Sequence, residues 1–163
     1  MSNTGGEAAA GTAPQSRPEP RLRLRPDHSA PALLDGGWWP RSADPAAELP
    51  GLILALDEWH GRVTRVMLGD AGWDASRPRR VKVAGPAGSR VVRLGWFATM
   101  PAGLLTAISA TGQRTDLVTV PEQTGERDAE VVMGQAARAG NREHAPVILA
   151  TIPASRAGAG KSA

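Results

Sequence analysis

Two residues in this sequence are the candidates for acid–base chemistry, His60 and Asp116. His60 ends a helical pattern, where the helix dipole favours a protonated imidazole, and Asp57 lies three residues before it. A histidine in that position more often only caps the helix. Asp116 alternates with two valines in a strand pattern, which places a carboxylate on a face shared with apolar residues. We expect Asp116 to form a structural ion pair with a strand arginine such as Arg93, and the alternative is a ligand contact.

Other catalytic chemistry has little support in the sequence. There is no cysteine and no histidine pair at metal-binding spacing, so thiolate nucleophiles and Cys-based metal sites are excluded, and we expect no metal and no cofactor. No serine lies in a nucleophile-elbow setting. Any enzyme activity would therefore depend on His60 or Asp116, and we favour a protein that is not an enzyme.

Arginine dominates the basic residues, with 17 arginines, 2 lysines and a net charge of +3. Arginine-bearing strands beside tryptophans such as Trp39, Trp73 and Trp96 could hold single-stranded nucleic acid by phosphate contacts and base stacking. The arginines concerned are Arg21, Arg23, Arg25, Arg41, Arg62, Arg65, Arg80, Arg90 and Arg93. The charge is modest, however, and no known RNA- or DNA-binding motif is present. Nucleic acid is therefore an alternative partner that the sequence does not favour.

The interpretation that the sequence favours is a non-enzymatic binding or interaction module. Trp38 and Trp39 are adjacent, so in a strand they point to opposite faces, and one should be partly exposed unless a helix or loop covers it. An exposed tryptophan beside Arg41 would form an amphipathic patch suited to a protein partner or a small ligand. The partner itself stays unknown. Because no segment resembles a membrane span or a signal peptide, we expect no membrane partner and a cytoplasmic location.

The elements that position these residues begin with residues 21–25, whose alternation of arginine and leucine predicts a half-buried strand. Asp35-Gly36 is a hairpin-type dipeptide, and residues 38–42 predict a short edge strand that contains a proline. Asp44 is a suitable N-cap with proline after it, and Gly61 a suitable C-cap, so the main helix lies between them. Pro50 could divide that helix into a short turn and a helix from about residue 50.

Short apolar alternations separated by Gly, Pro and Asp turns follow the main helix. They predict strands at residues 62–68, 79–84, 90–97, 104–110 and 114–120. Because links of two to six residues are too short for a parallel crossover, we expect these strands to be antiparallel neighbours. A weaker helix is predicted at 128–139, and the apolar run 146–153 could form an edge strand or a docked peptide.

The expected architecture is a single α+β domain over residues 21–140. It contains a curved antiparallel sheet of six or seven strands, with the main helix packed on one face and the weaker C-terminal helix nearby. Residues 1–20 lack large apolar side chains after Met1 and predict a disordered leader. Residues 141–163 predict a mostly flexible C-terminal extension.

One segment also carries a resemblance to a known family. The run LDGGWWPRS at residues 34–42, supported by GRVTRV at 61–66 and GWF at 95–97, resembles a family of small proteins from high-GC bacteria. That family is a domain of unknown function marked by an L-D-G-x-W-W-P-R-S signature. The resemblance covers about Leu22 to Pro121 and implies a shared fold core, but it implies no activity, cofactor or partner.

Overall fold

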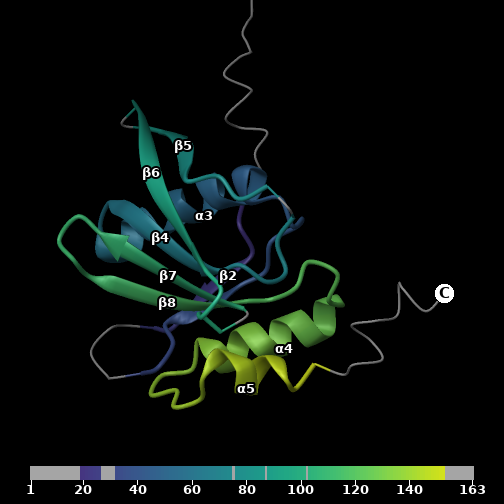
Figure 1. Cartoon of the computed structure of the whole chain (residues 1–163). Helices are drawn as coiled ribbons and strands as arrows, with labels where there is room; N and C mark the ends of the chain where they lie inside the picture. The colour runs from purple at the N-terminus through teal and green to yellow at the C-terminus, as the bar shows by residue number, and fades with distance from the viewer. Residues whose placement is uncertain (1–18, 27–31, 75, 87, 102, 153–163) are drawn as a thin grey trace, which may run out of the picture.

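The computed structural model describes residues 19–26, 32–74, 76–86, 88–101 and 103–152. Within them, seven strands form one sheet and three helices pack against it (Figure 1). The strands are β2 (Leu22–Leu24), β3 (Gly36–Trp38), β4 (Val63–Gly69), β5 (Arg80–Gly85), β6 (Gly88–Phe97), β7 (Leu104–Ser109) and β8 (Arg114–Thr119). The helices are α3 (Pro45–His60), α4 (Glu126–Ala136) and α5 (Ala145–Leu149). The predicted leader, up to residue 18, and the tail from residue 153 lie outside the described residues.

The sheet is mixed, with the strand order β2-β3-β8-β7-β4-β6-β5. β3 pairs with β8 and β4 pairs with β6 in parallel, whereas the other neighbours are antiparallel. The α+β class is confirmed, and the expectation of a purely antiparallel sheet is wrong. After β4 the chain forms the edge strand β5 and then returns as β6 between β5 and β4. The strand β5 therefore forms the connection between the parallel strands β4 and β6. The expectation that short links exclude parallel pairing did not consider a strand in this role.

Strand β3 also differs from its prediction. It lies between β2 and β8 instead of at an edge, and Asp35-Gly36 is not a hairpin turn, because Gly36 pairs with Leu24 inside the sheet. A Cβ atom at Gly36 would overlap the carbonyl oxygen of Arg23 on β2. Glycine is needed here for the close approach of two backbones.

Helix α3 begins and ends as the sequence predicts. The side chain of Asp44 accepts a hydrogen bond from the backbone N–H of Ala46 at 3.1 Å, and Gly61 ends the helix with φ +92°. The helix continues through Pro50, so the predicted division does not occur. Its apolar side packs on one face of the sheet in a first core. Fully buried members of that core include Leu49, Leu52, Ile53, Val66, Val83, Val92, Leu105 and Leu117.

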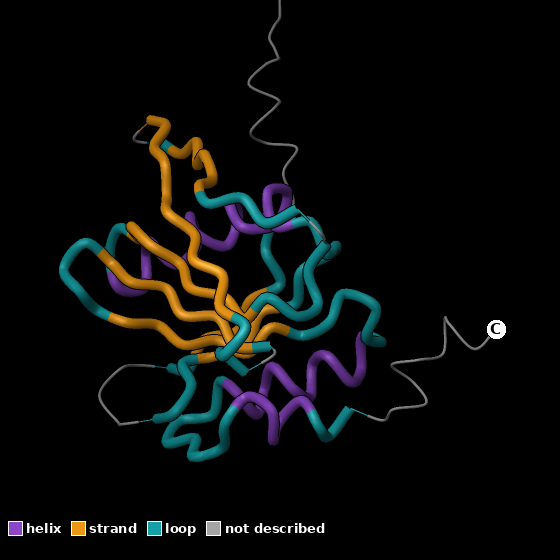
Figure 2. Tube along the Cα trace, in the orientation of Figure 1, coloured by secondary structure: helices purple, strands orange, loops and turns teal. Residues whose placement is uncertain are grey.

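Helices α4 and α5 cover part of the opposite face, so the sheet lies between helices (Figures 1 and 2). They pack mainly against β2, β3 and β8 and enclose a second core. The weaker predicted helix therefore exists, on the face opposite to α3. The apolar run that begins at Pro146 forms α5 instead of an edge strand. The second core contains Leu34, Trp39, Val118, Val120, Ala129, Val132, Met133, Ala136, Ala145 and Ile148.

The tryptophan pair connects the two cores. Trp38 is 1% exposed in the first core and Trp39 is 7% exposed in the second. The expectation that one of them is partly exposed is wrong, because α4 covers one face of β3 and the first core, in which Trp38 stacks with Trp73, covers the other. Side chains that alternate along a strand can both be buried only in a sheet that is covered on both sides.

Candidate anion-binding face

Half of the sheet is covered on one face only. On β6, Val92 and Leu94 are buried against the α3 side, so Arg93 and Phe97 point to the other side and are exposed. Figure 1 shows α4 and α5 at the opposite end of the sheet from the β5–β6 hairpin. No described helix therefore covers the outer surface of β4, β6 and β5, which we call open.

Arginines lie directly opposite one another on this open surface. Arg93 on β6 pairs in register with Arg80 on β5 and with Arg65 on β4. Arg79, one residue before β5, borders the same shallow hollow, which encloses about 340 Å³. We call the surface formed by Arg65, Arg79, Arg80 and Arg93, together with Met67 and Phe97, the arginine face.

The four guanidinium groups of the arginine face are exposed, and none forms a hydrogen bond or an ion pair with the described residues. Like charges directly opposite each other on neighbouring strands destabilise a sheet. Two such pairs share Arg93 in this sheet. The arrangement favours an anionic partner that would neutralise the row.

An aromatic ring adjoins the row of arginines. A Cβ atom at Gly95 would lie 2.8 Å from Cε2 of Phe97, so the ring lies over the glycine, between its own position and Arg93. Phe97 is 42% exposed, and Val91 on the same strand face is 57% exposed. Lys82 pairs in register with Val91 and adds a further positive charge to this side of the hairpin. The open surface thus combines cations with an accessible aromatic ring.

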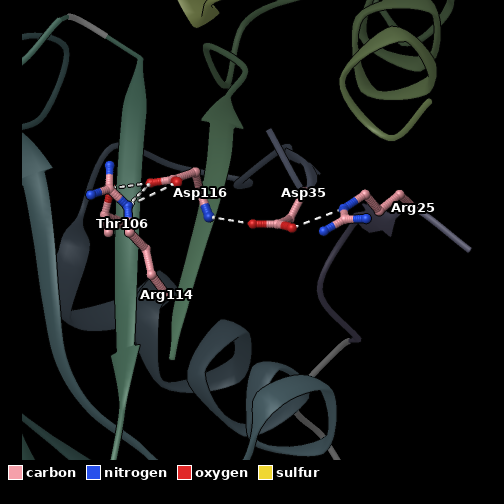
Figure 3. A network of polar contacts seen from close by, with 5 residues as sticks. All are labelled: Arg25, Asp35, Thr106, Arg114 and Asp116. Atoms are coloured by element: carbon pink, nitrogen blue, oxygen red, sulfur yellow. Dashed lines mark hydrogen bonds and ion pairs between the residues drawn. The ribbon is translucent and has the colours of Figure 1, made fainter. Parts of the chain in front are cut away.

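Asp116 belongs to a structural network (Figure 3). Its carboxylate accepts hydrogen bonds from Thr106 Oγ1 at 2.6 Å and from Arg114 Nε at 2.9 Å. The predicted ion pair with a strand arginine therefore exists, with Arg114 as the partner in place of Arg93. Arg114 lies two strands from Arg65 in the same cross-strand line, with Ile108 on β7 between them.

The same network extends to Asp35 at the start of β3 (Figure 3). Asp35 accepts hydrogen bonds from Arg25 Nε and from the backbone N–H of Asp116, both at 2.9 Å. The side chains of Arg25 and Asp35 are 8% and 10% exposed. This buried pair fixes the register of the parallel strands β3 and β8, so we assign it a structural role.

Arg41 and Trp39 are held within the protein. The guanidinium of Arg21 stacks 3.6 Å from the centre of the Trp39 ring and donates to the carbonyl oxygens of Trp39 and Pro40. Burial, with the like charge of Arg41, lowers the pKa of Arg21 from its ordinary value. Arg41 donates from its side chain to the carbonyl oxygen of Glu19. Trp38, Trp39 and Arg41 do line one common hollow, which encloses only about 90 Å³.

The remaining predicted site residues lie apart from the arginine face. Trp96 points to the α3 side, where its Nε1 donates to the carbonyl oxygen of Pro78 at 2.8 Å and its ring meets Trp73 edge-on. His60 packs beside Trp59 at the end of α3, with ring centres 5.6 Å apart. Neither His60 nor Asp116 lines the hollow of the arginine face or the hollow beside Trp39. No group of three or more His, Asp or Glu residues in the described part of the chain could hold a metal ion.

The structure thus brings one predicted site residue, Arg93, together with two arginines from the nucleic-acid hypothesis, Arg65 and Arg80. The sequence analysis missed Arg79 and Phe97. The spacing Arg93-x-Gly95-x-Phe97 could have indicated that Phe97 lies beside Arg93. Alternation places these residues on one face of the strand, opposite to the face of Val92 and Leu94. No signal in the sequence places Arg65 beside Arg93, since that pairing depends on the parallel crossover.

Comparison with models of known protein families identifies the family of this chain. Residues 21–136 match the model of a family of unknown function, DUF5994. The chain belongs to this family. The DUF5994 match runs from the strand β2 to the end of α4, so it includes the arginine face and stops before α5. The resemblance to a domain of unknown function is confirmed. No curated protein and no solved structure matches the chain.

None of the described helices is long and apolar enough to span a membrane. The longest of them, α3, has 16 residues and carries charged side chains.

Proposed function

We propose that this DUF5994 protein is a non-enzymatic binding module that holds single-stranded nucleic acid on the arginine face. One observation carries the proposal: Arg80, Arg93 and Arg65 lie opposite one another on an open sheet surface, without an ion pair to any described residue. Guanidinium groups bind phosphates as planar forks, and a phosphate chain would neutralise several of them at once.

The aromatic ring favours nucleic acid over a simple polyanion. Phe97 is partly exposed beside the arginines, and aromatic rings on sheets are platforms on which unpaired bases stack. The open surface is formed by strands, and the main helix α3 lies on the other face. None of the described helices projects from this surface to enter a major groove, so we favour single strands over duplex DNA.

The other two functions considered from the sequence have weaker support. Both tryptophans of the expected Trp–Arg41 patch are buried, and the hollow beside them, about 90 Å³, is far below the roughly 300 Å³ of small-molecule sites. An enzyme based on Asp116 would have to use a carboxylate that already accepts three hydrogen bonds.

The experiment is a titration of the full-length protein into a fluorescein-labelled, mixed-sequence single-stranded oligonucleotide, followed by fluorescence anisotropy. We expect saturable binding that weakens steeply between about 50 and about 200 mM salt, because each released counterion contributes to the slope. With three or four phosphates engaged, the slope of log K against log salt should be about −2 to −3. Absence of binding at the lower salt concentration contradicts the proposal.

Arg93→Gln is the decisive variant, and Arg138→Gln is its matched control. Both remove one positive charge from an exposed side chain, but Arg138 follows helix α4 and lies outside the arginine face. We expect Arg93→Gln to weaken binding about tenfold and to make the salt slope shallower by about 0.7. Equal effects of the two variants would show that binding follows net charge instead of the site.

Phe97→Leu tests base stacking separately from charge. The side chain is exposed, so the fold should tolerate the change, while loss of stacking should weaken oligonucleotide binding about tenfold at unchanged salt slope. Val131→Ala, which changes another exposed apolar residue on α4, serves as the control. Heparin, a polyanion without bases, should bind the wild type and Phe97→Leu equally. A loss of heparin affinity in Phe97→Leu would contradict a stacking role.

A further inference from the structure

A third hollow lies beyond the ends of three strands that run in the same direction. β3, β8 and β4 share one direction, because β3 is parallel to β8 and β7 is antiparallel to both β8 and β4. The segments after these strands enclose about 290 Å³, which we call the Trp73 pocket. In open sheets with parallel strands, ligands bind outside the carboxyl ends of the strands, where the loops diverge.

Glycines close to neighbouring groups help to form the walls of the Trp73 pocket. A Cβ atom at Gly69 would lie 2.7 Å from the carbonyl oxygen of Pro101. Gly103 has φ +81°, and a Cβ atom there would overlap the side chain of Leu149 on α5. Both glycines line the pocket, so its shape is set largely by backbone and by packed apolar groups.

Trp73 is held in place by other tryptophans. Its ring lies 5.9 Å from that of Trp38 in a stacked arrangement and 6.2 Å from that of Trp96 edge-on. Trp38 is almost fully buried, and Trp96 is fixed by its hydrogen bond to Pro78. Trp73 is therefore an ordered aromatic wall, available to a ligand without much loss of side-chain entropy.

The charge in the Trp73 pocket has the opposite sign to that of the protein. The chain has a net charge of +3, but the described residues that line the pocket include no arginine, lysine or histidine and one acidic residue, Glu122. Glu122 is half-buried and forms no ion pair or hydrogen bond with the described residues. Glu122 and Trp73 both line the pocket, and a carboxylate near an aromatic ring suits an organic cation, which both attract.

We infer that the Trp73 pocket binds a small organic cation that carries an aromatic or apolar body, such as an aralkylammonium ion. The apolar walls, which include Leu104, Val120 and Leu149, would receive the body, and Glu122 would pair with the ammonium group. The volume is at the lower end of the range for small-molecule sites, so the occupant is compact. This site is separate from the arginine face and carries the opposite charge.

The test compares three probes of similar size, the phenethylammonium ion, 2-phenylethanol and 3-phenylpropanoate, by titration calorimetry and intrinsic tryptophan fluorescence. We expect phenethylammonium to bind saturably, with a dissociation constant on the order of 1 mM or tighter. It should bind at least about fivefold tighter than the alcohol, and the carboxylate should bind most weakly. No saturable binding of phenethylammonium, or equal binding of the three probes, overturns the inference.

Glu122→Gln separates charge recognition from apolar packing. We expect this variant to lose the preference for the cation while 2-phenylethanol binds as before. Glu58→Gln, an equal charge change at an exposed residue of α3 outside the pocket, should keep the preference. A preference that survives in Glu122→Gln, or is lost in Glu58→Gln, overturns the assignment. Because the oligonucleotide experiment uses a different site, either proposal can fail without the other.

Discussion

At the scale of single residues, the arginines of the open sheet surface are placed at a cost to stability. Arg93 faces Arg80 on one side and Arg65 on the other, and no described acidic side chain pairs with any of them. By contrast, Arg25, Arg90, Arg23 and Arg114 each form an ion pair. What distinguishes the row at Arg93 is that its arginines lie directly opposite one another, and this supports the proposal that the row binds an anionic ligand.

We predict that Arg93→Thr stabilises the free protein while it weakens oligonucleotide binding. Threonine suits a strand and removes two like-charge neighbours, so the melting temperature at low salt should rise by roughly 1 to 3 °C. The gain should shrink as salt is added, because exposed charges are screened. Differential scanning calorimetry at two salt concentrations measures this, and a lower melting temperature at low salt would assign Arg93 a structural role.

The opposite result is expected at Asp35, whose buried carboxylate bridges Arg25 and the backbone N–H of Asp116. Asp35→Asn removes the negative charge beside a buried guanidinium and should lower the free energy of unfolding by about 3 kcal/mol. Asp74→Asn, at an exposed residue, should change it by less than about 0.5 kcal/mol. Urea unfolding followed by circular dichroism gives both values, and similar small losses would contradict a stabilising pair.

At the scale of elements, α5 is part of the packed domain although it lies beyond the predicted boundary at residue 140. Ile148 is fully buried in the second core, and Leu149 closes one side of the Trp73 pocket. Asn141, in the connection before α5, accepts a hydrogen bond at its carbonyl oxygen from the backbone N–H of Leu33 at 2.8 Å. We therefore propose that residues 141–152 belong to the folded unit.

A pair of adjacent substitutions tests the packing of α5. Ile148→Ala should lower the free energy of unfolding by about 2 to 5 kcal/mol, because it leaves a cavity in the second core. Val147→Ala, at a side chain that is 53% exposed, should cost less than about 1 kcal/mol. Urea denaturation measures the two changes under the same conditions. Equally small effects would mean that α5 does not stabilise the domain in solution.

At the scale of the whole molecule, the two cores share one sheet and meet at β3, where Trp38 enters one and Trp39 the other. We therefore expect the loss of packing in either core to disturb β3, which contributes to both cores. We predict that thermal or urea unfolding is a single cooperative transition. Tryptophan fluorescence and far-ultraviolet circular dichroism should then give coincident curves. Two separate midpoints would show that the α4–α5 side unfolds independently of the α3 side.

Several features of this protein were determined by its sequence alone. The strands β4 to β8, the cap at Asp44, the end of α3 at Gly61 and the family were all predicted, because each depends on side chains that are close together in the chain. The alternation that places Asp116 with apolar residues and beside an arginine was also predicted. Hydrophobic periodicity and turn residues indicate the secondary structure of the segment in which they occur.

Only the tertiary structure decided how these elements are arranged. Whether Trp39 is exposed depends on α4 (Glu126–Ala136) and α5 (Ala145–Leu149), which lie far along the chain and form the second core with it. The row of arginines exists because β6 inserts between β4 and β5, a pairing that no short segment specifies. The Trp73 pocket likewise joins the ends of strands that are distant in sequence. Which side chains are buried, and which residues lie near one another, depends on packing between segments that are distant in the chain. Alternation therefore indicates that a strand has two different faces, but it does not indicate which elements cover each face.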